Sequence, residues 1–369
     1  MTVLLYFSIF YSLLLVLFIM GLLRSYRSNG DSTKNFISVI IACKNEQDNI
    51  ERLITALKSQ NYNKDYFEVI FADDDSKDQT AQIVKNLVQF EPNFQYHFVS
   101  SETLTHIKGK KKPLTFAINH SKGDILAFTD ADCEPYPDWL SDINDAFNNH
   151  TDFYAGYSPL MFSKNSIINK LKALERTSIF AVCAGSFGLN IPLTCTARNM
   201  AYTKDLWNGG EGYKGIEHIL SGDDDLMLHK LRHLIKKYHF SFNPKAIVPS
   251  YENKDFTEQI HSETRRTSKF THYPFFIKLM VIFIAIFYCL LLYKCCLLIN
   301  NFHSFKLFDL LIAITSKLFL EFTLIYLFLK KIGKSGGELS LFLLAELIYI
   351  PYFLFFGIKG TFGKYKWKN

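Results

Sequence analysis

The sequence predicts an α/β domain with a mostly parallel sheet, flanked by transmembrane α-helices. Two observations predict this fold class. In the middle of the chain, short β-rich apolar runs alternate with helical patterns, as expected for strands joined by crossover helices. Hydrophobic residues also make up 49% of the 369 residues, with 35 phenylalanines among them, which is more than an ordinary soluble protein contains. Part of the chain is therefore expected to face lipid.

The hydrophobic excess is concentrated in four blocks, each about as long as the ~20 apolar residues that a spanning helix needs. The blocks are Val3–Leu23, Phe275–Ile299, Leu307–Leu329 and Leu339–Ile358. No basic segment precedes the first block and no cleavage pattern follows it, so we expect it to remain as an anchor. Basic residues cluster where the blocks end, which is typical of membrane-surface charge and not of nucleic-acid binding.

The basic residues also predict the side of the membrane. If positive charge marks the cytoplasmic side, the region after the first block lies in the cytoplasm of a multi-pass cell-membrane protein, of the bacterial inner-membrane type. Four full crossings would place the basic C-terminus outside, against the same rule. The last block contains Glu346 and Pro351. We therefore expect that this block is re-entrant or lies in the interface, unless the tail is an exception.

The expected organisation has five parts. They are an anchor (1–24), a cytoplasmic α/β domain (25–250), a juxtamembrane segment (251–274), a membrane region of about three helices (275–358) and a basic tail (359–369). The seven cysteines are scattered except for Cys295-Cys296, and none has paired metal-ligand spacing. This usage predicts a reduced, cytoplasmic domain without disulfides.

Three predicted strands of the α/β domain end in polar loops. The strands are Phe36–Ala42, Phe67–Ala72 and Ile125–Thr129, and the loops that follow them are Lys44-Asn45-Glu46, Asp73–Asp78 and Asp130-Ala131-Asp132. Ligands of open α/β sheets bind beyond the carboxyl ends of the strands. We therefore expect the three loops to converge on one crevice.

Two of these loops are acidic. Asp130 and Asp132 could ligate Mg²⁺ or Mn²⁺ together, and the open positions of the metal would bind phosphate oxygens of a leaving diphosphate. Such a pair is common by chance, so its position at a strand end carries the prediction. Asp73 and Asp74 have two interpretations that are compatible. They could bind a nucleotide base and ribose, or form an Asx-type turn that caps the helix beginning near Thr80.

Four motifs together resemble the family 2 glycosyltransferases, an inverting family with a Rossmann-like GT-A fold. In order, they are Ser38-Val39-Ile40-Ile41-Ala42-Cys43-Lys44-Asn45-Glu46, Asp73-Asp74-Asp75-Ser76-Lys77-Asp78-Gln79-Thr80, Lys110-Lys111-Lys112-Pro113-Leu114-Thr115 and Thr129-Asp130-Ala131-Asp132. The resemblance covers Phe36–Leu234, about half of the chain. It implies a nucleotide-sugar donor, of the UDP- or GDP-sugar class, whose nucleoside contacts the first loop and Asp74. It also implies that Lys112 lies near the donor diphosphate and that Asp130 and Asp132 bind the metal.

The sequence departs from the family pattern at two places in these motifs. Ala42 stands where proline is common, and Asp75 stands where glycine is usual. Neither change removes a ligand. Asp75 adds negative charge beside the expected nucleotide pocket.

A further acidic run, Asp223-Asp224-Asp225, resembles the acceptor-side motif of the family. There a carboxylate takes the proton of the acceptor hydroxyl as that oxygen attacks the anomeric carbon. Asp223 is the first choice for this base and Asp224 the second. The alternative is that these residues only favour a helix N-terminus, which would explain one carboxylate but not three.

Two residue pairs that contain arginine complete the resemblance. Arg198-Asn199 resembles a segment that supports the acceptor site, and the alternative is a surface turn. Arg265-Arg266 stands where membrane-bound relatives carry an Arg-Trp pair on the donor diphosphate, although Thr267 follows here. A juxtamembrane basic patch would explain this pair equally well.

The expected site residues fall into four groups. They are Asp223 and Asp224 for catalysis; Ala42, Lys44, Asn45, Glu46, Asp73, Asp74, Lys112, Asp130, Arg265 and Arg266 for the donor; Arg198, Asn199 and Asp225 for the acceptor; and Asp130 and Asp132 for the metal. The resemblance implies hexosyl transfer to a lipid-linked or membrane-proximal glycan acceptor, in contact with membrane lipids. Three alternatives stay open: a processive polysaccharide synthase, a metal-dependent nucleotidyltransferase and a non-catalytic scaffold.

Overall fold

The structure is a computed structural model that describes residues 2–24, 33–162, 164–251, 256–300 and 307–362. Most of the expected basic tail, residues 363–369, lies outside the described residues. The chain divides into two compact units. The sheet unit comprises Ser25–Ser163 and Thr194–Asn253, and the helical unit comprises Met1–Arg24, Lys164–Leu193 and Lys254–Asn369.

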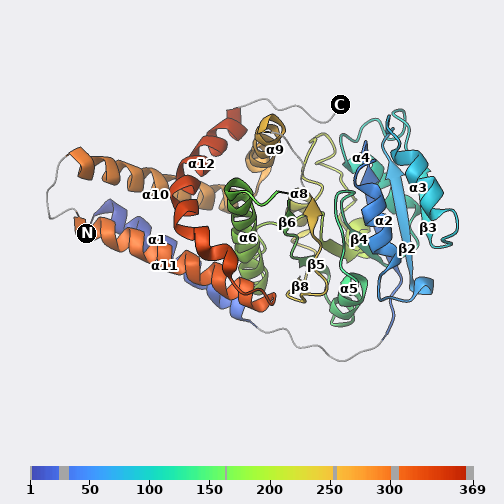
Figure 1. Ribbon diagram of the computed structural model, residues 1–369, viewed down its shortest axis with the longest axis horizontal. Coiled ribbons are helices and arrows are strands. Elements are labelled where there is room, and N and C mark those ends of the chain that lie inside the picture. The colour runs from blue at the N-terminus through green and yellow to red at the C-terminus, as the bar shows by residue number, and fades with distance from the viewer. Residues whose placement is uncertain (1, 25–32, 163, 252–255, 301–306, 363–369) are drawn as a thin grey trace. The chain divides into compact units, whose positions relative to one another are not determined.

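The sheet unit contains a seven-stranded sheet in the order β3-β2-β1-β4-β7-β5-β8, part of which is seen in Figure 1. Its strands are β1 (Ile37–Cys43), β2 (Phe67–Asp73), β3 (Phe94–Phe98), β4 (Ile125–Phe128), β5 (Phe153–Gly156), β7 (Met200–Thr203) and β8 (Tyr238–Ser241). The first four in spatial order are parallel, and β7 runs antiparallel to both of its neighbours. The prediction of a mostly parallel α/β sheet is therefore confirmed.

Helices connect and cover these strands. They are α2 (Ile50–Lys58), α3 (Thr80–Val88), α4 (Lys111–His120), α5 (Trp139–Asn148), α7 (Lys204–Gly209) and α8 (Asp225–Leu231). A second, small sheet pairs β6 (Leu160–Met161) with β9 (Ser250–Tyr251). Every residue of β2 is buried, because a parallel sheet is covered on both faces by its crossover helices. The apolar stripe of α2, at spacings of three and four residues, is buried in the same core as β1.

The register of the parallel strands fixes where the polar loops lie. Cys43 at the end of β1 pairs with Asp73 at the end of β2, and Ile40 pairs with Phe128 at the end of β4. The loops that follow β1, β2 and β4 therefore leave the sheet at the same edge, as the sequence predicts.

The helical unit contains six α-helices among the described residues. They are α1 (Val3–Leu23), α6 (Ile167–Gly188), α9 (Phe256–Ser268), α10 (Phe275–Asn300), α11 (Leu307–Lys331) and α12 (Phe342–Phe362). Four helical segments of this part are long and apolar enough to cross a membrane: Val3–Leu23, Phe275–Leu298, Leu307–Lys331 and Gly337–Thr361. Pro351 lies inside α12, so the last block forms one helix and not a re-entrant hairpin. An interfacial orientation of this helix stays a prediction.

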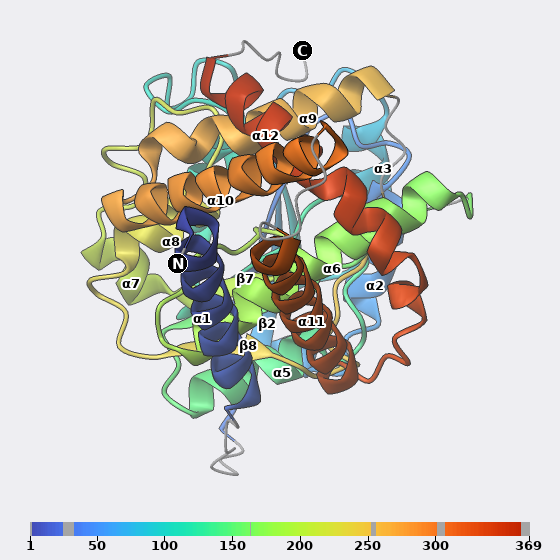
Figure 2. The same ribbon diagram turned by 90° about the vertical axis from the view of Figure 1, so that its left-hand side faces the viewer.

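The units differ from the expected domain boundaries at α6. The sequence places this helix inside the 25–250 domain, but it groups with the helical unit, where Figure 2 shows it running across α1 and α11. Glycines make this packing close. A Cβ atom on Gly188 would lie 1.9 Å from the carbonyl oxygen of Gly21, and one on Gly185 would lie 2.5 Å from that of Phe18. The two backbones approach so closely that no side chain fits between them.

A buried polar network joins the four helices that could span a membrane. Lys317 of α11 is 3% exposed and forms ion pairs with Glu321 of the same helix and Glu346 of α12. The hydroxyl of Tyr11 in α1 donates to Glu321 and lies 3.2 Å from the hydroxyl of Tyr288 in α10. Ionisable groups in such helices are costly unless they are paired, so these contacts favour one arrangement of the helices.

The glycine crossing generates a stability prediction. Gly188→Val should destabilise the protein in detergent by at least about 2 kcal/mol, because the new side chain meets backbone atoms that cannot rotate away. Gly357→Val is the matched control in α12, where a Cβ atom would meet nothing within 4 Å. The measurement is thermal unfolding of both purified variants. Equal stability of the two variants would contradict the close crossing.

Candidate active site

The loops after β1 and β2 are joined by hydrogen bonds. The amide of Asn45 donates to Ser76 Oγ at 3.0 Å, and its side-chain oxygen accepts from the amide of Lys77 at 2.8 Å. The amide of Glu46 donates to Thr80 Oγ1 at 2.8 Å. Asn45 has a φ of 53°, a left-handed conformation that asparagine tolerates well. Asn45 and Glu46 therefore hold the two loops together through their backbone and amide groups.

The acidic loop after β2 divides its carboxylates between two roles. Asp73 is buried and accepts from the hydroxyl of Tyr96 at 2.8 Å and from the amide of Ser76 at 3.0 Å. It therefore shapes the turn. Asp74 faces two lysines, with Lys112 Nζ at 2.6 Å and Lys44 Nζ at 3.7 Å. Asp74 is thus the residue of the pair whose carboxylate lies among cationic side chains that could contact a donor.

Asp75, which stands where glycine is usual in the family, adopts a left-handed backbone conformation. Its φ is 59°, in the left-handed region that glycine enters without strain. Its side chain pairs with exposed Lys77 at 2.7 Å, and this hydrogen bond lowers the pKa of the Asp75 carboxyl. Asp78 accepts from the amide of Thr80 at 3.0 Å and forms an Asx-type turn just before α3.

Three consecutive lysines at the start of α4 reach three different loops. Lys110 forms ion pairs with Asp130 and, at 3.6 Å, with Asp223 Oδ2. Lys111 is fully buried and donates to the carbonyls of Ile219 and Ser221, both at 2.6 Å. Successive side chains of a helix point about 100° apart. Three adjacent lysines can therefore reach three different loops.

Lys110 is the residue of this run that the sequence reasoning missed. The sequence predicts that Lys112 is the lysine near the diphosphate, whereas in the structure Lys112 pairs with Asp74 and Lys110 pairs with Asp130. The two lysines differ in the carboxylate that each one reaches, and the sequence does not indicate which lysine reaches which carboxylate. The expected diphosphate contact of Lys112 stays a prediction.

Asp130 lies between two cations. Arg198 Nε is 3.6 Å from Asp130 Oδ2, and Lys110 contacts the other carboxylate oxygen. Burial by itself would raise the pKa of Asp130, but the charges of Lys110 and Arg198 outweigh it and hold this pKa below its usual value. Burial would likewise lower the pKa of Lys110, and Asp130 and Asp223 raise it. Asp130 is thus kept ionised.

Arg198 and Asn199 have different roles in the structure. Asn199 is completely buried, where it accepts from Trp139 Nε1 at 2.9 Å and donates to the carbonyl of Tyr157 at 3.1 Å. It is a structural residue of the core, and Arg198 is the one that reaches the carboxylates. The surface-turn interpretation does not describe this pair.

The structure separates the three aspartates at the start of α8. Asp224 accepts from the amide of Asp225 at 2.8 Å, and Asp225 accepts from the amide of Leu226 at 2.8 Å. These two carboxylates cap the helix, as expected for acidic residues at a helix N-terminus. Asp223 instead points to Lys110. The charge of Asp224 also acts on Lys110 and Asp130, so Asp223 and Asp224 both lie near the motif of Asp130.

The remaining predicted residues contribute less to this geometry. Ala42 is part of β1, where it pairs with Ala72. Arg265 and Arg266 belong to α9 of the helical unit, and Arg266 pairs with Glu175 at 2.6 Å and Glu263 at 2.7 Å. Their expected donor contact stays a prediction.

Asp130 and Asp132 are compatible with a hard divalent cation. Carboxylate oxygens are the ligands that Mg²⁺ and Mn²⁺ prefer. Within the described residues no lysine or arginine pairs with Asp132, whose Oδ1 accepts a weak hydrogen bond from Cys133 Sγ at 3.3 Å. Its charge is thus available for a cation. The described part of the chain holds no group of three or more such ligands, so a bound phosphate would have to supply further oxygens.

Parts of this chain are similar to known proteins. Residues 38–200, from β1 to the start of β7, match the family model for glycosyl transferase family 2. Glycosyltransferase AglE of Haloferax volcanii is 35% identical over 109 residues, which cover 30% of this chain and 34% of that protein. The undecaprenyl-phosphate 4-deoxy-4-formamido-L-arabinose transferase of Edwardsiella ictaluri is 30% identical over 116 residues, covering 31% and 34%. The matches thus span about a third of the length of these relatives.

A solved structure shares the fold of the whole chain. The mannosyltransferase PcManGT of Pyrobaculum calidifontis, in complex with GDP-Man and Mn²⁺, has a TM-score of 0.56 at 14% identity and covers 98% of this chain and 99% of its own. The chain therefore has the GT-A fold that its motifs predict. Residues 38–200 belong to glycosyl transferase family 2, as the four motifs predict.

The pairing of Lys110 with Asp130 generates a prediction about stability and pH. Lys110→Met should lower the free energy of unfolding at pH 7 by about 1–3 kcal/mol, because it leaves a largely buried carboxylate with one cation fewer. Without Lys110 the pKa of Asp130 is higher, because one of the two cations that oppose the effect of burial is gone, and the neutral acid tolerates burial. The difference from the unmodified protein should therefore shrink as pH falls from 7 to about 5.

The measurement is denaturant unfolding at both pH values. Lys77→Met is the matched control, since this lysine is 75% exposed in its pair with Asp75 and its loss should leave stability almost unchanged. A Lys110→Met effect that stays constant or grows towards acid would contradict the assignment.

Proposed function

We propose that this chain is an inverting hexosyltransferase that moves a sugar from a UDP- or GDP-sugar to a lipid-linked or membrane-proximal glycan acceptor. A divalent metal, Mg²⁺ or Mn²⁺, would be held by Asp130 and Asp132. In this proposal the sheet unit is a catalytic domain on the cytoplasmic side of the membrane. The spanning segments keep it at the bilayer, where such an acceptor is presented.

One observation carries the proposal: Lys110 contacts both Asp130 and Asp223. The first carboxylate follows β4 and belongs to the expected metal site. The second precedes α8 and is the expected base. Because the ammonium group of Lys110 contacts both carboxylates, Asp130 and Asp223 are separated by no more than two ion-pair distances. In the proposal, Asp130 serves the leaving diphosphate and Asp223 serves the attacking hydroxyl. A sugar transfer by direct displacement needs this proximity.

The residues of the chain divide the chemistry as follows. Asp74, with Lys44 and Lys112, faces the nucleoside and phosphates of the donor. Asp223 accepts the proton of the acceptor hydroxyl while that oxygen forms a bond to the anomeric carbon and the bond to the diphosphate oxygen breaks on the opposite face. A metal at Asp130 and Asp132 would supply positive charge to the departing diphosphate. Lys110 and Arg198 keep Asp130 ionised and in place.

Two further observations support the acceptor class. Four helical segments of the described chain are apolar enough for a bilayer. One relative is named for a transferase acting with undecaprenyl phosphate, which is a lipid carrier. Processive polymerisation remains the second candidate within the same chemistry, and the length of the product distinguishes it from a single transfer.

The proposed roles of the carboxylates predict separate defects. Detergent-solubilised protein is incubated with UDP-glucose, UDP-N-acetylglucosamine or GDP-mannose, with Mg²⁺ or Mn²⁺ and a membrane lipid extract. Asp132→Asn should lose metal-dependent donor binding and at least about 100-fold in turnover. Asp223→Asn should lose about 100-fold or more in turnover while donor binding is kept, because general-base catalysis contributes about 10²–10⁴-fold.

Asp65→Asn is the matched control, because Asp65 is exposed and precedes β2, at the end of the strand opposite its acidic loop. It should keep activity within about twofold. Normal transfer by both Asp132→Asn and Asp223→Asn would refute the mechanism. Release of pyrophosphate, with the nucleoside monophosphate joined to the acceptor, would instead identify a nucleotidyltransferase.

A further inference from the structure

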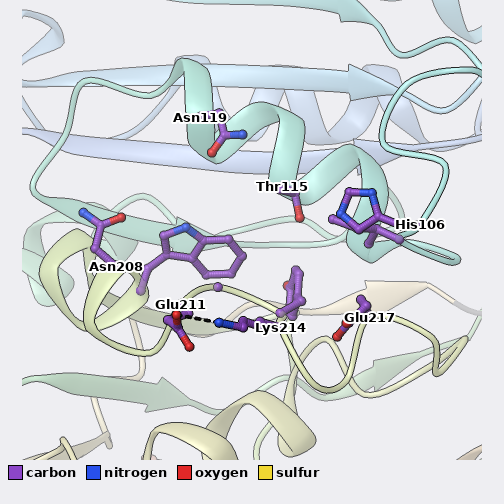
Figure 3. Close-up of a pocket in the computed structure, with 11 residues that line it drawn as sticks. His106, Thr115, Asn119, Asn208, Glu211, Lys214 and Glu217 are labelled. Carbon is purple, nitrogen blue, oxygen red and sulfur yellow. Dashed lines mark hydrogen bonds and ion pairs between the residues drawn. The ribbon is translucent and has the colours of Figure 1, made fainter.

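The cavity drawn in Figure 3 presents no open ring surface to a ligand. It lies between α4 and the loop that follows α7, and its aromatic residues Trp207 and Tyr213 are only 5% and 2% exposed. Its Lys214 is paired with Glu211, the contact drawn as a dashed line. The start of α6, in the helical unit, differs in this respect. There Ile167 is 60% exposed although it lies outside the four segments that could span a membrane.

Two contacts place α6 at one end of the spanning segments. Gly188 packs against Gly21, which belongs to the last turn of α1. Thr177 donates to Glu338 at 3.1 Å, at the beginning of the spanning segment Gly337–Thr361. Figure 2 shows α6 running across α1 and α11. Because α1 ends and the last segment begins beside α6, this helix lies near one boundary of the bilayer that they would span.

The face of α6 that packs on the spanning segments continues into its first turn. Ile167 precedes Leu174 by seven residues and Lys170 precedes Thr177 by seven, which is close to two turns of a helix. Leu174 and Thr177 are three residues apart and share this face. Both are buried, whereas Ile167 and Lys170 are exposed. Protein therefore covers this face at Leu174 and Thr177 and leaves it open in the first turn.

The open turn is also basic. Lys164 and Lys170 are exposed, and Lys172 follows on the next turn. No aspartate or glutamate occurs between Asp152 and Glu175. Apolar side chains beside lysines are typical of helices that lie in the interface of a bilayer, where the lysines are attracted to anionic lipids. The charge of this turn and its continuity with the spanning segments therefore favour a lipid surface as its partner.

We propose that the first turn of α6 binds the headgroup region of an anionic phospholipid bilayer. Ile167 enters the boundary between headgroups and acyl chains, and Lys164 and Lys170 pair with lipid phosphates. The proposal rests on the membrane location proposed above for the spanning segments. It adds a local preference for acidic phospholipids, which neither apolar spanning segments nor the catalytic carboxylates require.

The first test measures how deep neighbouring positions of α6 lie. The full chain is placed in nanodiscs whose lipids carry bromine on the acyl chains near the headgroup, and the fluorescence of the unmodified protein is subtracted. The tryptophan of Ile167→Trp should be quenched at least about twofold more than that of Ile168→Trp. Ile168 is the matched control because it is 65% exposed but lies two and a half turns from Thr177, on the opposite face.

The second test measures the preference for lipid charge. Nanodiscs contain equal amounts of phosphatidylcholine and phosphatidylglycerol, and the bromine is carried by one lipid or by the other. Bromine on phosphatidylglycerol should quench Ile167→Trp more strongly than bromine on phosphatidylcholine. Adding Lys164→Gln and Lys170→Gln should abolish this difference. Adding Lys236→Gln and Lys245→Gln, which remove two exposed lysines of the sheet unit, should leave it unchanged.

A further variant separates this proposal from the membrane location on which it rests. Leu13 of α1 is 55% exposed, so Leu13→Trp should be quenched strongly if α1 spans the bilayer. Absence of this quenching would refute both the location and the α6 proposal. Strong quenching of Leu13→Trp with equal, weak quenching of Ile167→Trp and Ile168→Trp would overturn the α6 proposal alone. Equal quenching of Ile167→Trp by the two brominated lipids would likewise overturn it.

Discussion

The ion pairs of Lys110 with Asp130 and Asp223 are the constraint on which the site depends. The parallel register of β1, β2 and β4 brings their acidic loops to one edge of the sheet, where like charges would repel. Cations inserted from other segments make this arrangement stable. Lys110 and Lys112 come from the start of α4, and Arg198 comes from the residues before β7. The positive groups are therefore as much part of the site as the aspartates.

The same helix start also fixes the segment that carries the candidate base. Lys111 is buried completely, a rare position for lysine, and its ammonium group donates to two backbone carbonyls before Gly222. These hydrogen bonds fix the backbone just before Asp223 and do not involve its carboxylate. Because Lys110 and Lys111 are adjacent, any shift of α4 would move the partner of Asp130 and the support of Asp223 together.

The sequence predicts the parts of this structure that follow from local pattern. The strands, the apolar stripe of α2 and the convergence of the loops follow from periodicity and from the topology of parallel sheets. The choice between Lys110 and Lys112, or between Asp223 and Asp224, depends on which direction each side chain takes from a turn. That direction is set by contacts between residues distant in sequence. Glycine is usual at the position of Asp75, and only the structure shows that this residue has a positive φ, which glycine adopts easily.

The place of α6 shows the same limit at a larger scale. Its sequence lies between β6 and β7, so reading along the chain assigns it to the sheet unit. Its glycines pack against the backbone of Phe18 and Gly21 in α1, more than 150 residues earlier, and Arg24 donates to the carbonyl of Gly188 at 3.0 Å. The chain leaves the helical unit after Leu193 and reaches Arg198 a few residues later. The arginine that holds Asp130 is therefore attached, through a short segment, to a helix whose packing depends on the N-terminal span.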